Sequence, residues 1–277
     1  MKIFTRTLFA MLLSAGGCAL AQGVAFITNL QGDVAVDGNS RPLVLAELAK
    51  GQKIVIGKDA LVSVMYTASG KEFTLKGPGE YQVKDAEVAT ATGNPPAVRS
   101  TDWRASNKVL AHVARTSSAS VRMRSIAQPK PDTRPKLLFP TQGEVATLQP
   151  AFRWSVADAS APGEFTLLVA GQDKPVHRAK ASGGSYRIPA RLKPDTEYAW
   201  TVSVAGEEIG TGKFRTLPAQ SIQLIEKRKP SDKAEFSDRL LFALYLQEMG
   251  AVQEARDLWS RLAQERTDLP ELSALAK

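Results

Sequence analysis

The segment RLKPDTEYAWTVSVAG, residues 191–206, carries the strongest fold signal in the chain. Its second half alternates, which places Tyr198 and Trp200 on the same side of a strand. Before the strand, Pro194 fixes a bend and Leu192 can close the end of a hydrophobic core. We expect the ring of Tyr198 to be buried and its hydroxyl to bond back to the backbone. The segment is therefore predicted to be scaffold, and not the rim of an active site.

Strand-like segments surround this stretch between residues 137 and 217. AFRWSV places Phe152 and Trp154 on one side of a strand, and EFTLLVAG does the same for Phe165 and Leu167. About seven strands in about eighty residues predict an immunoglobulin-like sandwich.

The spacing Leu192-x-Pro194-x-Thr196-x-Tyr198 resembles the tyrosine corner of fibronectin type III-like domains. The resemblance spans the whole of residues 137–217 and implies a fibronectin type III-like sandwich there.

Residues 23–90 also alternate between apolar and polar positions, with a glycine or asparagine at each break. This predicts a series of short strands and hairpins, one of which turns at Ser69-Gly70. RPLVLAELAKGQ, residues 41–52, is left open between a helical turn and a strand followed by a loop.

The glycines and strand positions of this region resemble the FecR-like domain, an all-β module of bacterial cell-envelope proteins. The matching positions are Gly32-x-Val34, Leu48-x-x-Gly51-x-x-Ile54, Gly57-x-x-Ala60-x-Val62, Ser69-Gly70 and Leu75-x-Gly77-x-Gly79. Ile56 stands where that pattern commonly has Thr, and Ser69 where it commonly has Asp. The founding members pass a signal across a membrane. We do not carry that role over, because we expect neither a cytoplasmic head nor a retained span in this chain.

Residues 91–136 are predicted to form a basic linker that contains a short helix capped by Thr101. The linker has nine Lys or Arg residues against two Asp residues. One interpretation is a solvated spacer. The other is that Arg side chains, with their planar forks, contact an acidic surface together with an aromatic residue. The candidate binding residues are Arg99, Trp103, Arg104, Arg122 and Arg124.

From residue 218 to residue 277 the period becomes helical. A first helix is expected to end before Pro230, a second to start at a Ser231 cap and end at Gly250, and a third to carry Trp259 on its apolar stripe. The helical hairpin resembles one tetratricopeptide-like repeat. A single repeat cannot bury its own stripe, so we expect it to dock on a β domain or on another chain.

The first 21 residues have the layout of a secretory signal peptide, with Lys2 and Arg6 before an apolar run and Ala19-Leu20-Ala21 at the cleavage site. Cleavage after Ala21 implies a periplasmic or secreted protein. A lipoprotein signal that uses Cys18 is the alternative, although Ala15 stands where such signals usually carry Leu. Because Cys18 is the single cysteine of the chain, the mature protein cannot form a disulfide.

The search for catalytic chemistry is negative. His112 and His177 have no neighbouring histidine at ligand spacing, and both are expected to face solvent. The glycine-rich stretches lack the ending of a phosphate loop, and the pair Glu207-Glu208 fits an exposed hairpin. We therefore predict a protein that is not an enzyme and that has no cofactor, no metal and no nucleic-acid partner.

Together these patterns predict a mainly β, multidomain protein: a small FecR-like β domain, an immunoglobulin or fibronectin III-like β-sandwich, and a C-terminal α-helical hairpin. The expected order is a signal peptide (1–21), the first β domain (22–90), the basic linker (91–136), the sandwich (137–217) and the hairpin (218–277). The expected function is binding or scaffolding in the bacterial envelope, through contacts with a protein or with an anionic surface such as a wall polymer or lipid headgroups. A FecR-type signalling component with a membrane partner and a binder of cell-wall glycan are the alternatives.

Overall fold

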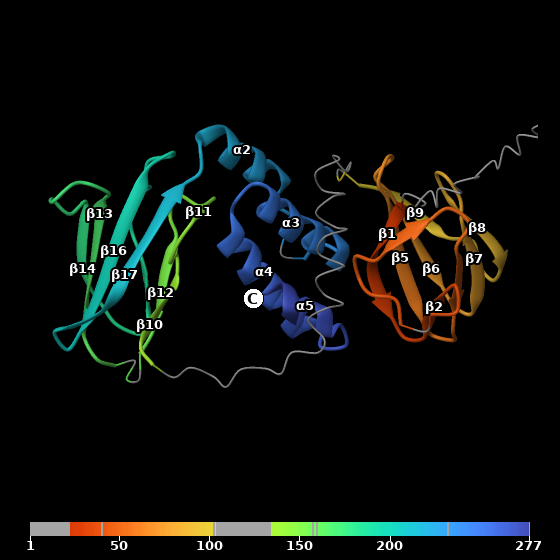
Figure 1. The fold of residues 1–277 in the computed structure, drawn as a ribbon, viewed down its shortest axis with the longest axis horizontal. Coiled ribbons are helices and arrows are strands. Elements are labelled where there is room, and N and C mark those ends of the chain that lie inside the picture. Colours follow the sequence, from red (N-terminus) through yellow and green to blue (C-terminus); the bar gives the residue numbers. More distant parts are fainter. Residues whose placement is uncertain are drawn as a thin grey trace, which may run out of the picture.

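The computed structural model describes residues 23–276 apart from 40, 102, 104–133, 157, 159 and 232. It contains two β units with a helical unit between them, and the C-terminal helices lie at the centre (Figure 1). The prediction of a mainly β, multidomain chain with a C-terminal helical part is confirmed. The predicted signal peptide lies outside the described residues.

The first β unit packs a five-stranded sheet, in the order β3-β1-β5-β6-β9, and a four-stranded sheet, in the order β2-β4-β7-β8. Its strands are β1 (Gly23–Gln31), β2 (Val34–Val36), β3 (Glu47–Ala49), β4 (Lys53–Ile56), β5 (Leu61–Tyr66), β6 (Lys71–Lys76), β7 (Gly79–Val83), β8 (Val88–Thr92) and β9 (Ala97–Ser100). The alternation of the sequence places Ile27, Val62 and Tyr81 in a buried core.

Two of the predicted turn positions in this unit have a clear steric reason. Gly70 closes the β5–β6 hairpin with a positive φ of 68°, as the Ser69-Gly70 turn predicts. At Gly77 a Cβ atom would lie 1.8 Å from the carbonyl oxygen of Gly57, so the chain can pass there only without a side chain. The open question at residues 41–52 is settled as a loop followed by β3.

The predicted linker starts earlier in the sequence than the structure allows. Strand β8 continues to Thr92, and β9 pairs antiparallel with β6 as an edge strand, with Arg99 opposite Glu72. Residues 97–100 alternate too briefly to be recognised as a strand from the sequence. They are held there by the free edge of β6.

The second β unit packs a three-stranded sheet, β10-β12-β15, and a five-stranded sheet, β11-β17-β16-β13-β14. Its strands are β10 (Lys136–Phe139), β11 (Glu144–Val145), β12 (Ala151–Ser155), β13 (Gly163–Val169), β14 (His177–Ala181), β15 (Ser185–Arg187), β16 (Glu197–Val204) and β17 (Glu207–Thr216). The rings of Phe152, Phe165 and Trp200 meet in its core at centroid distances of 4.7 to 5.8 Å.

The corner predicted at residues 191–200 has the expected geometry. Tyr198 is buried, and its hydroxyl accepts a hydrogen bond of 2.9 Å from the backbone N–H of Lys193. Trp200 is fully buried and donates its indole N–H to the carbonyl oxygen of Pro140 at 2.5 Å. This segment is scaffold.

The helical unit contains α2 (Ala219–Arg228), α3 (Phe236–Glu248), α4 (Val252–Glu265) and α5 (Pro270–Leu275). Helix α2 ends before Pro230, and Gly250, with a φ of 88°, separates α3 from α4. The predicted Ser231 cap is wrong. The Ser231 carbonyl instead closes a turn with the N–H of Ala234, and the extended Glu235 is the cap residue of α3. Helix α5 was not expected from the sequence.

Helix α3 is apolar on all sides, and residues 240–246 are all buried. A helix of this kind needs partners on more than one face. Its partners are α4 and the first β unit, because one continuous hydrophobic cluster contains the helices together with Phe26, Val44, Leu45 and Met65. Ala146 and Leu217 of the second β unit join the same cluster. The expectation that the hairpin docks on a β domain is confirmed, and it docks on both.

Polar contacts reinforce the junction of the helical unit with the second β unit. Glu254 of α4 accepts hydrogen bonds from the backbone N–H groups of Ala146 and Thr147, at 2.6 and 3.3 Å. Gln253 exchanges two hydrogen bonds with Thr141. These contacts fix the direction of α4 against the start of β11.

The junction with the first β unit is also polar at its rim. Arg266, at the end of α4, donates to the side-chain oxygen of Asn29 at 2.6 Å and to the carbonyl oxygen of Leu30. Glu271 of α5 accepts from the backbone N–H of Val44 at 3.0 Å. The helical unit therefore holds both β units through apolar and polar contacts.

Candidate functional site

Arg99, the first of the predicted binding residues, is used inside the chain. From β9 its guanidinium donates to both carboxylate oxygens of Asp238 on α3, at 2.9 and 3.1 Å, and to the hydroxyl of Ser237 at 2.7 Å. It also pairs with Glu72, whose residue is 2% exposed and which accepts from Thr28 as well. The buried carboxylate of Glu72 is thus fully partnered, as a buried charge must be.

The charge of Arg99 is secured by this arrangement. Burial alone would lower the pKa of the guanidinium, but the hydrogen bond to Asp238 and the attraction of Glu72 raise the pKa above its ordinary value. The acidic surface that the sequence led us to expect for Arg99 is therefore found on α3 and β6 of the same chain.

Trp103, the second predicted residue, lies against α3. Its ring centroid is 6.5 Å from that of Phe242 and 6.0 Å from that of Tyr245. The guanidinium of Arg228, from the end of α2, lies 4.9 Å from the centroid of Tyr245 and 5.9 Å from that of Trp103. Two aromatic rings and one cation thus form a wall beside the junction of β9 and α3.

Arg99 and Trp103 line the same pocket, which has a volume of about 630 Å³ and lies between β9, α2 and the start of α3. The charged side chains along it are Arg99, Lys227, Arg228, Lys229 and Asp238. Its apolar side is formed by Trp103, Leu224, Pro230 and Ala234. Among the described residues of the lining, four cationic groups face one carboxylate, which makes this a positively charged pocket with an apolar wall; we call it the basic pocket.

The position of the cations has a partial structural explanation. The negative end of the helix dipole stabilises Lys227 and Arg228 in the last turn of α2. The helix dipole of α2 does not account for the position of Arg99, because Arg99 belongs to strand β9. The convergence of two separate elements is a property of the tertiary structure.

Arg104, Arg122 and Arg124, and the short helix expected after Thr101, lie outside the described residues. Lys227, Arg228 and Lys229 were not among the predicted binding residues. Their signal was the run KRK just before Pro230, which marks the end of a helix equally well.

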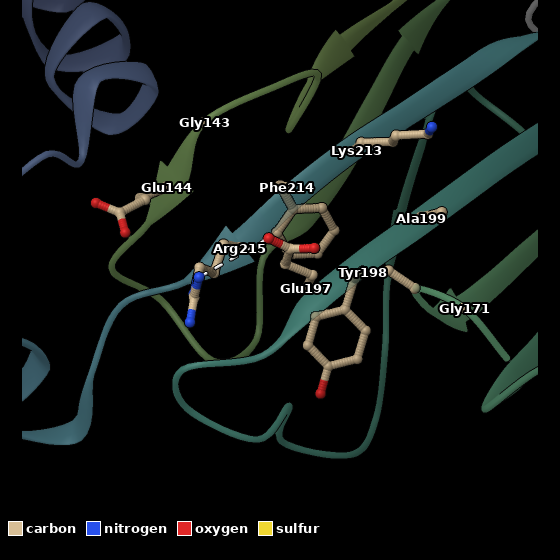
Figure 2. Close-up of a pocket in the computed structure, with 10 residues that line it drawn as sticks. Gly143, Glu144, Gly171, Glu197, Tyr198, Ala199, Lys213, Phe214 and Arg215 are labelled. Carbon is tan, nitrogen blue, oxygen red and sulfur yellow. Dashed lines mark ion pairs between the residues drawn. The ribbon is translucent and has the colours of Figure 1, made fainter.

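A second pocket, of about 570 Å³, lies on the second β unit between β11, β16 and β17 (Figure 2). Its described lining has two acidic and two basic side chains, and the basic Arg215 already bonds to nearby Asp195 at 2.8 Å and lies 3.8 Å from Glu197. The ring of Tyr198 belongs to the sandwich core. This pocket therefore offers less to a charged ligand than the basic pocket does.

Of the two histidines that were expected to face solvent, the structure describes His177. His177 is half-buried and not solvent-facing, because its ring stacks on Tyr186 and its Nε2 lies 2.8 Å from the Tyr186 hydroxyl. His112 lies outside the described residues. Within the described part of the chain, no three or more His, Cys, Asp or Glu side chains are grouped so that they could hold a metal ion. None of the described helices is long and apolar enough to cross a membrane.

No protein-family model and no curated protein matches the chain. Two of the similar solved structures are of the extracellular domain of BT4673 from B. thetaiotaomicron, described in one case as a hybrid two-component system and in the other as a one-component system. Both are 8% identical to the chain, cover 70% of it, and have TM-scores of 0.23 and 0.22. The chain spans 37% of the length of these structures. Scores this low do not establish a common fold, so the site is interpreted from its own geometry.

Proposed function

We propose that this chain is a non-enzymatic binding protein of the bacterial envelope that holds an anionic partner at the basic pocket. The observation that carries the proposal is the convergence of Arg99, Lys227, Arg228 and Lys229 around one pocket, whose described lining contains one carboxylate. A concentration of one charge sign in a concave site raises the local concentration of the opposite charge.

The pocket is better suited to binding than to proton transfer. Guanidinium and ammonium groups remain protonated near neutral pH, so they attract an anion but do not act readily as bases. Asp238, the carboxylate of the pocket, is held by both nitrogen atoms at the tip of Arg99. This carboxylate is therefore already used in a structural ion pair.

The architecture supports a binding or scaffolding role. The helical unit shares one apolar cluster with both β units, so the pocket is built on elements that are fixed by packing. Sites on packed helices and strands are held more firmly than sites on loops. The envelope location rests on the signal peptide predicted at residues 1–21.

The test is binding of the purified protein to two soluble polyanions, polyphosphate and poly-glutamate, at increasing salt. The variant carries Lys227→Glu and Lys229→Glu, and the matched control carries Lys174→Glu and Lys180→Glu on the second β unit, which change the net charge equally. We expect the pocket variant to lose at least tenfold in affinity for one or both polyanions, and the control to lose less than threefold. Affinity should also fall with salt because exposed charges are screened.

Equal loss in the two variants would show that binding follows net charge and not the pocket. Binding that is unchanged in the pocket variant would also refute the proposal. Capture of isolated cell wall that survives high salt would favour the glycan-binding alternative instead, since stacking and hydrogen bonds are screened less than surface charge.

A further inference from the structure

We infer that the basic pocket docks the protein on an anionic phospholipid surface, with Lys227 and Lys229 at the headgroup phosphates and Leu224 in the acyl boundary. The inference rests on the proposed function and names its partner.

The two arginine residues of the pocket already interact with other side chains of the chain. Arg99 is bound to Asp238 and Glu72, and Arg228 lies over the rings of Tyr245 and Trp103. The fork of Arg99 is therefore occupied by carboxylates of the same chain, and one face of the Arg228 guanidinium is covered by aromatic rings. An acidic protein partner is recognised best by arginine forks that grip carboxylates with two hydrogen bonds. Among the described residues that line the pocket, only Arg228 has such a fork without a carboxylate partner.

The two lysine residues of the pocket are available to a ligand. Lys227 and Lys229 are exposed at the C-terminal end of α2, and neither forms an ion pair with another described residue. A lysine ammonium is a compact charge on a flexible stem, which suits phosphate groups whose positions vary. Attraction of such lysines to an anionic leaflet acts over about one Debye length.

Leu224 is an exposed apolar residue on the same helix as Lys227. It is one of few large apolar residues that the described chain leaves exposed, at 50%, whereas its helix neighbours Ile222 and Ile225 are buried in the shared cluster. Leu224 precedes Lys227 by three residues, so the two side chains lie on one face of α2. Leu224 and Lys227 thus place an apolar side chain beside a cation on one exposed helix face, with Lys229 at the end of the helix, and helices at a membrane interface combine apolar and cationic side chains in this way.

Helix α2 is held in place by its buried apolar face. Ile222 and Ile225 anchor it to the cluster that contains α3, and Trp103 lies on the opposite side of the pocket. Because the helix is already folded, docking does not require the ordering of a flexible segment.

The test is flotation of the purified protein with vesicles of phosphatidylcholine alone and of phosphatidylcholine with 30 mol% phosphatidylglycerol. We expect binding to the anionic vesicles only. Lys227→Gln and Lys229→Gln should each weaken the partition about fivefold, and Leu224→Ala should weaken it about fivefold without a change in net charge. The matched controls are Lys174→Gln, Lys180→Gln and Val176→Ala, the last of which removes an apolar side chain that is 49% exposed on the second β unit.

Trp103 provides a readout of position. The other three tryptophan residues, Trp154, Trp200 and Trp259, are buried to 4% exposure or less, so quenching by lipids brominated near the headgroup should come mainly from Trp103. We expect this quenching to disappear in a Trp103→Phe variant that still binds vesicles.

The outcomes separate the inference from the proposed function. Binding to polyphosphate that depends on Lys227 and Lys229, without binding to anionic vesicles, would overturn the lipid inference and leave the proposed function intact. Vesicle binding that is indifferent to Leu224→Ala would overturn the assignment of Leu224. Binding to poly-glutamate that is much tighter than binding to vesicles would favour an acidic protein partner and contradict the inference. No binding to any of the probes would refute both proposals.

Discussion

Arg99 of β9 and Asp238 of α3 are 139 residues apart in the sequence and form a bidentate ion pair, with N···O distances of 2.9 and 3.1 Å. The same guanidinium neutralises Glu72, which is almost completely buried. One side chain thus connects the edge of the first β sheet to the helical unit and also forms part of the basic pocket.

Replacing Arg99 by Ala should lower the free energy of unfolding by about 3 kcal/mol, because it leaves the buried carboxylate of Glu72 without its cation. The change is measured by urea denaturation at pH 7. Arg178→Ala, which breaks an exposed pair with Glu164, is the matched control and should cost less than about 1 kcal/mol. Adding Glu72→Gln to the Arg99→Ala variant should restore part of the loss. Equal effects at Arg99 and Arg178 would show that the pair is not a structural connection.

Glu254 should make the stability depend on pH. Burial raises its pKa from an ordinary value of 4.5 to about 7, although hydrogen bonds from the N–H groups of Ala146 and Thr147 lower it and nearby Asp257 raises it further. Because the folded pKa is the higher one, the folded state binds the proton more tightly. The contribution of Glu254 is therefore complete below about pH 4.5 and is lost as the pH rises through 7.

The measurement is the free energy of unfolding at intervals between pH 5 and pH 8. The part of the decrease that is due to Glu254 should be about 3 kcal/mol at most, and it should vanish in Glu254→Gln. The exposed Glu226→Gln is the control and should keep the wild-type slope. The lowered pKa values of Glu265 and Asp268, each hydrogen-bonded by an Arg, act only at lower pH. A slope that survives in Glu254→Gln would count against this explanation.

The Tyr198 corner should stabilise the second β unit through a single hydrogen bond. Tyr198→Phe removes the acceptor of the Lys193 N–H and should cost about 1 kcal/mol. The near-ultraviolet circular dichroism of the sandwich aromatics follows the unfolding. Lys193→Ala should have almost no effect, because the backbone of that residue is the donor. A Tyr198→Phe variant as stable as the wild type would mean that water replaces the hydroxyl without cost.

The first β unit should depend on the helices to cover part of its apolar surface. A chain that ends after Leu217 would expose Phe26, Val44, Leu45 and Met65, which the helices cover in the complete chain. We expect a several-fold increase in the fluorescence of an apolar dye and a greater tendency to aggregate. The near-ultraviolet signal of the second β unit should remain as an internal control. A truncated chain that is monomeric and binds no dye would show that the cluster is not a shared core.

The candidate site was predictable only in part. The basic composition of residues 91–136 pointed to Arg99 and Trp103, and both line the basic pocket. Lys227, Arg228 and Lys229 were not identified, because a cationic run at the end of a helix is explained equally well by the helix dipole. Their significance depends on the placement of α2 and β9 around one pocket, and that placement has no local signature in the sequence.

Short-range sequence patterns specify the individual strands and helices. Period-two alternation, turn glycines and the Leu192-to-Tyr198 corner specify the β units, and the change to helical period specifies the C-terminal unit, because these preferences act between residues close in the chain. Long-range packing places β9 in the first sheet, encloses α3 between α4 and the first β unit, and brings Arg99 to Asp238. Such contacts depend on the shape and charge of surfaces that only exist after the elements have formed, so a reading of short-range patterns cannot supply them.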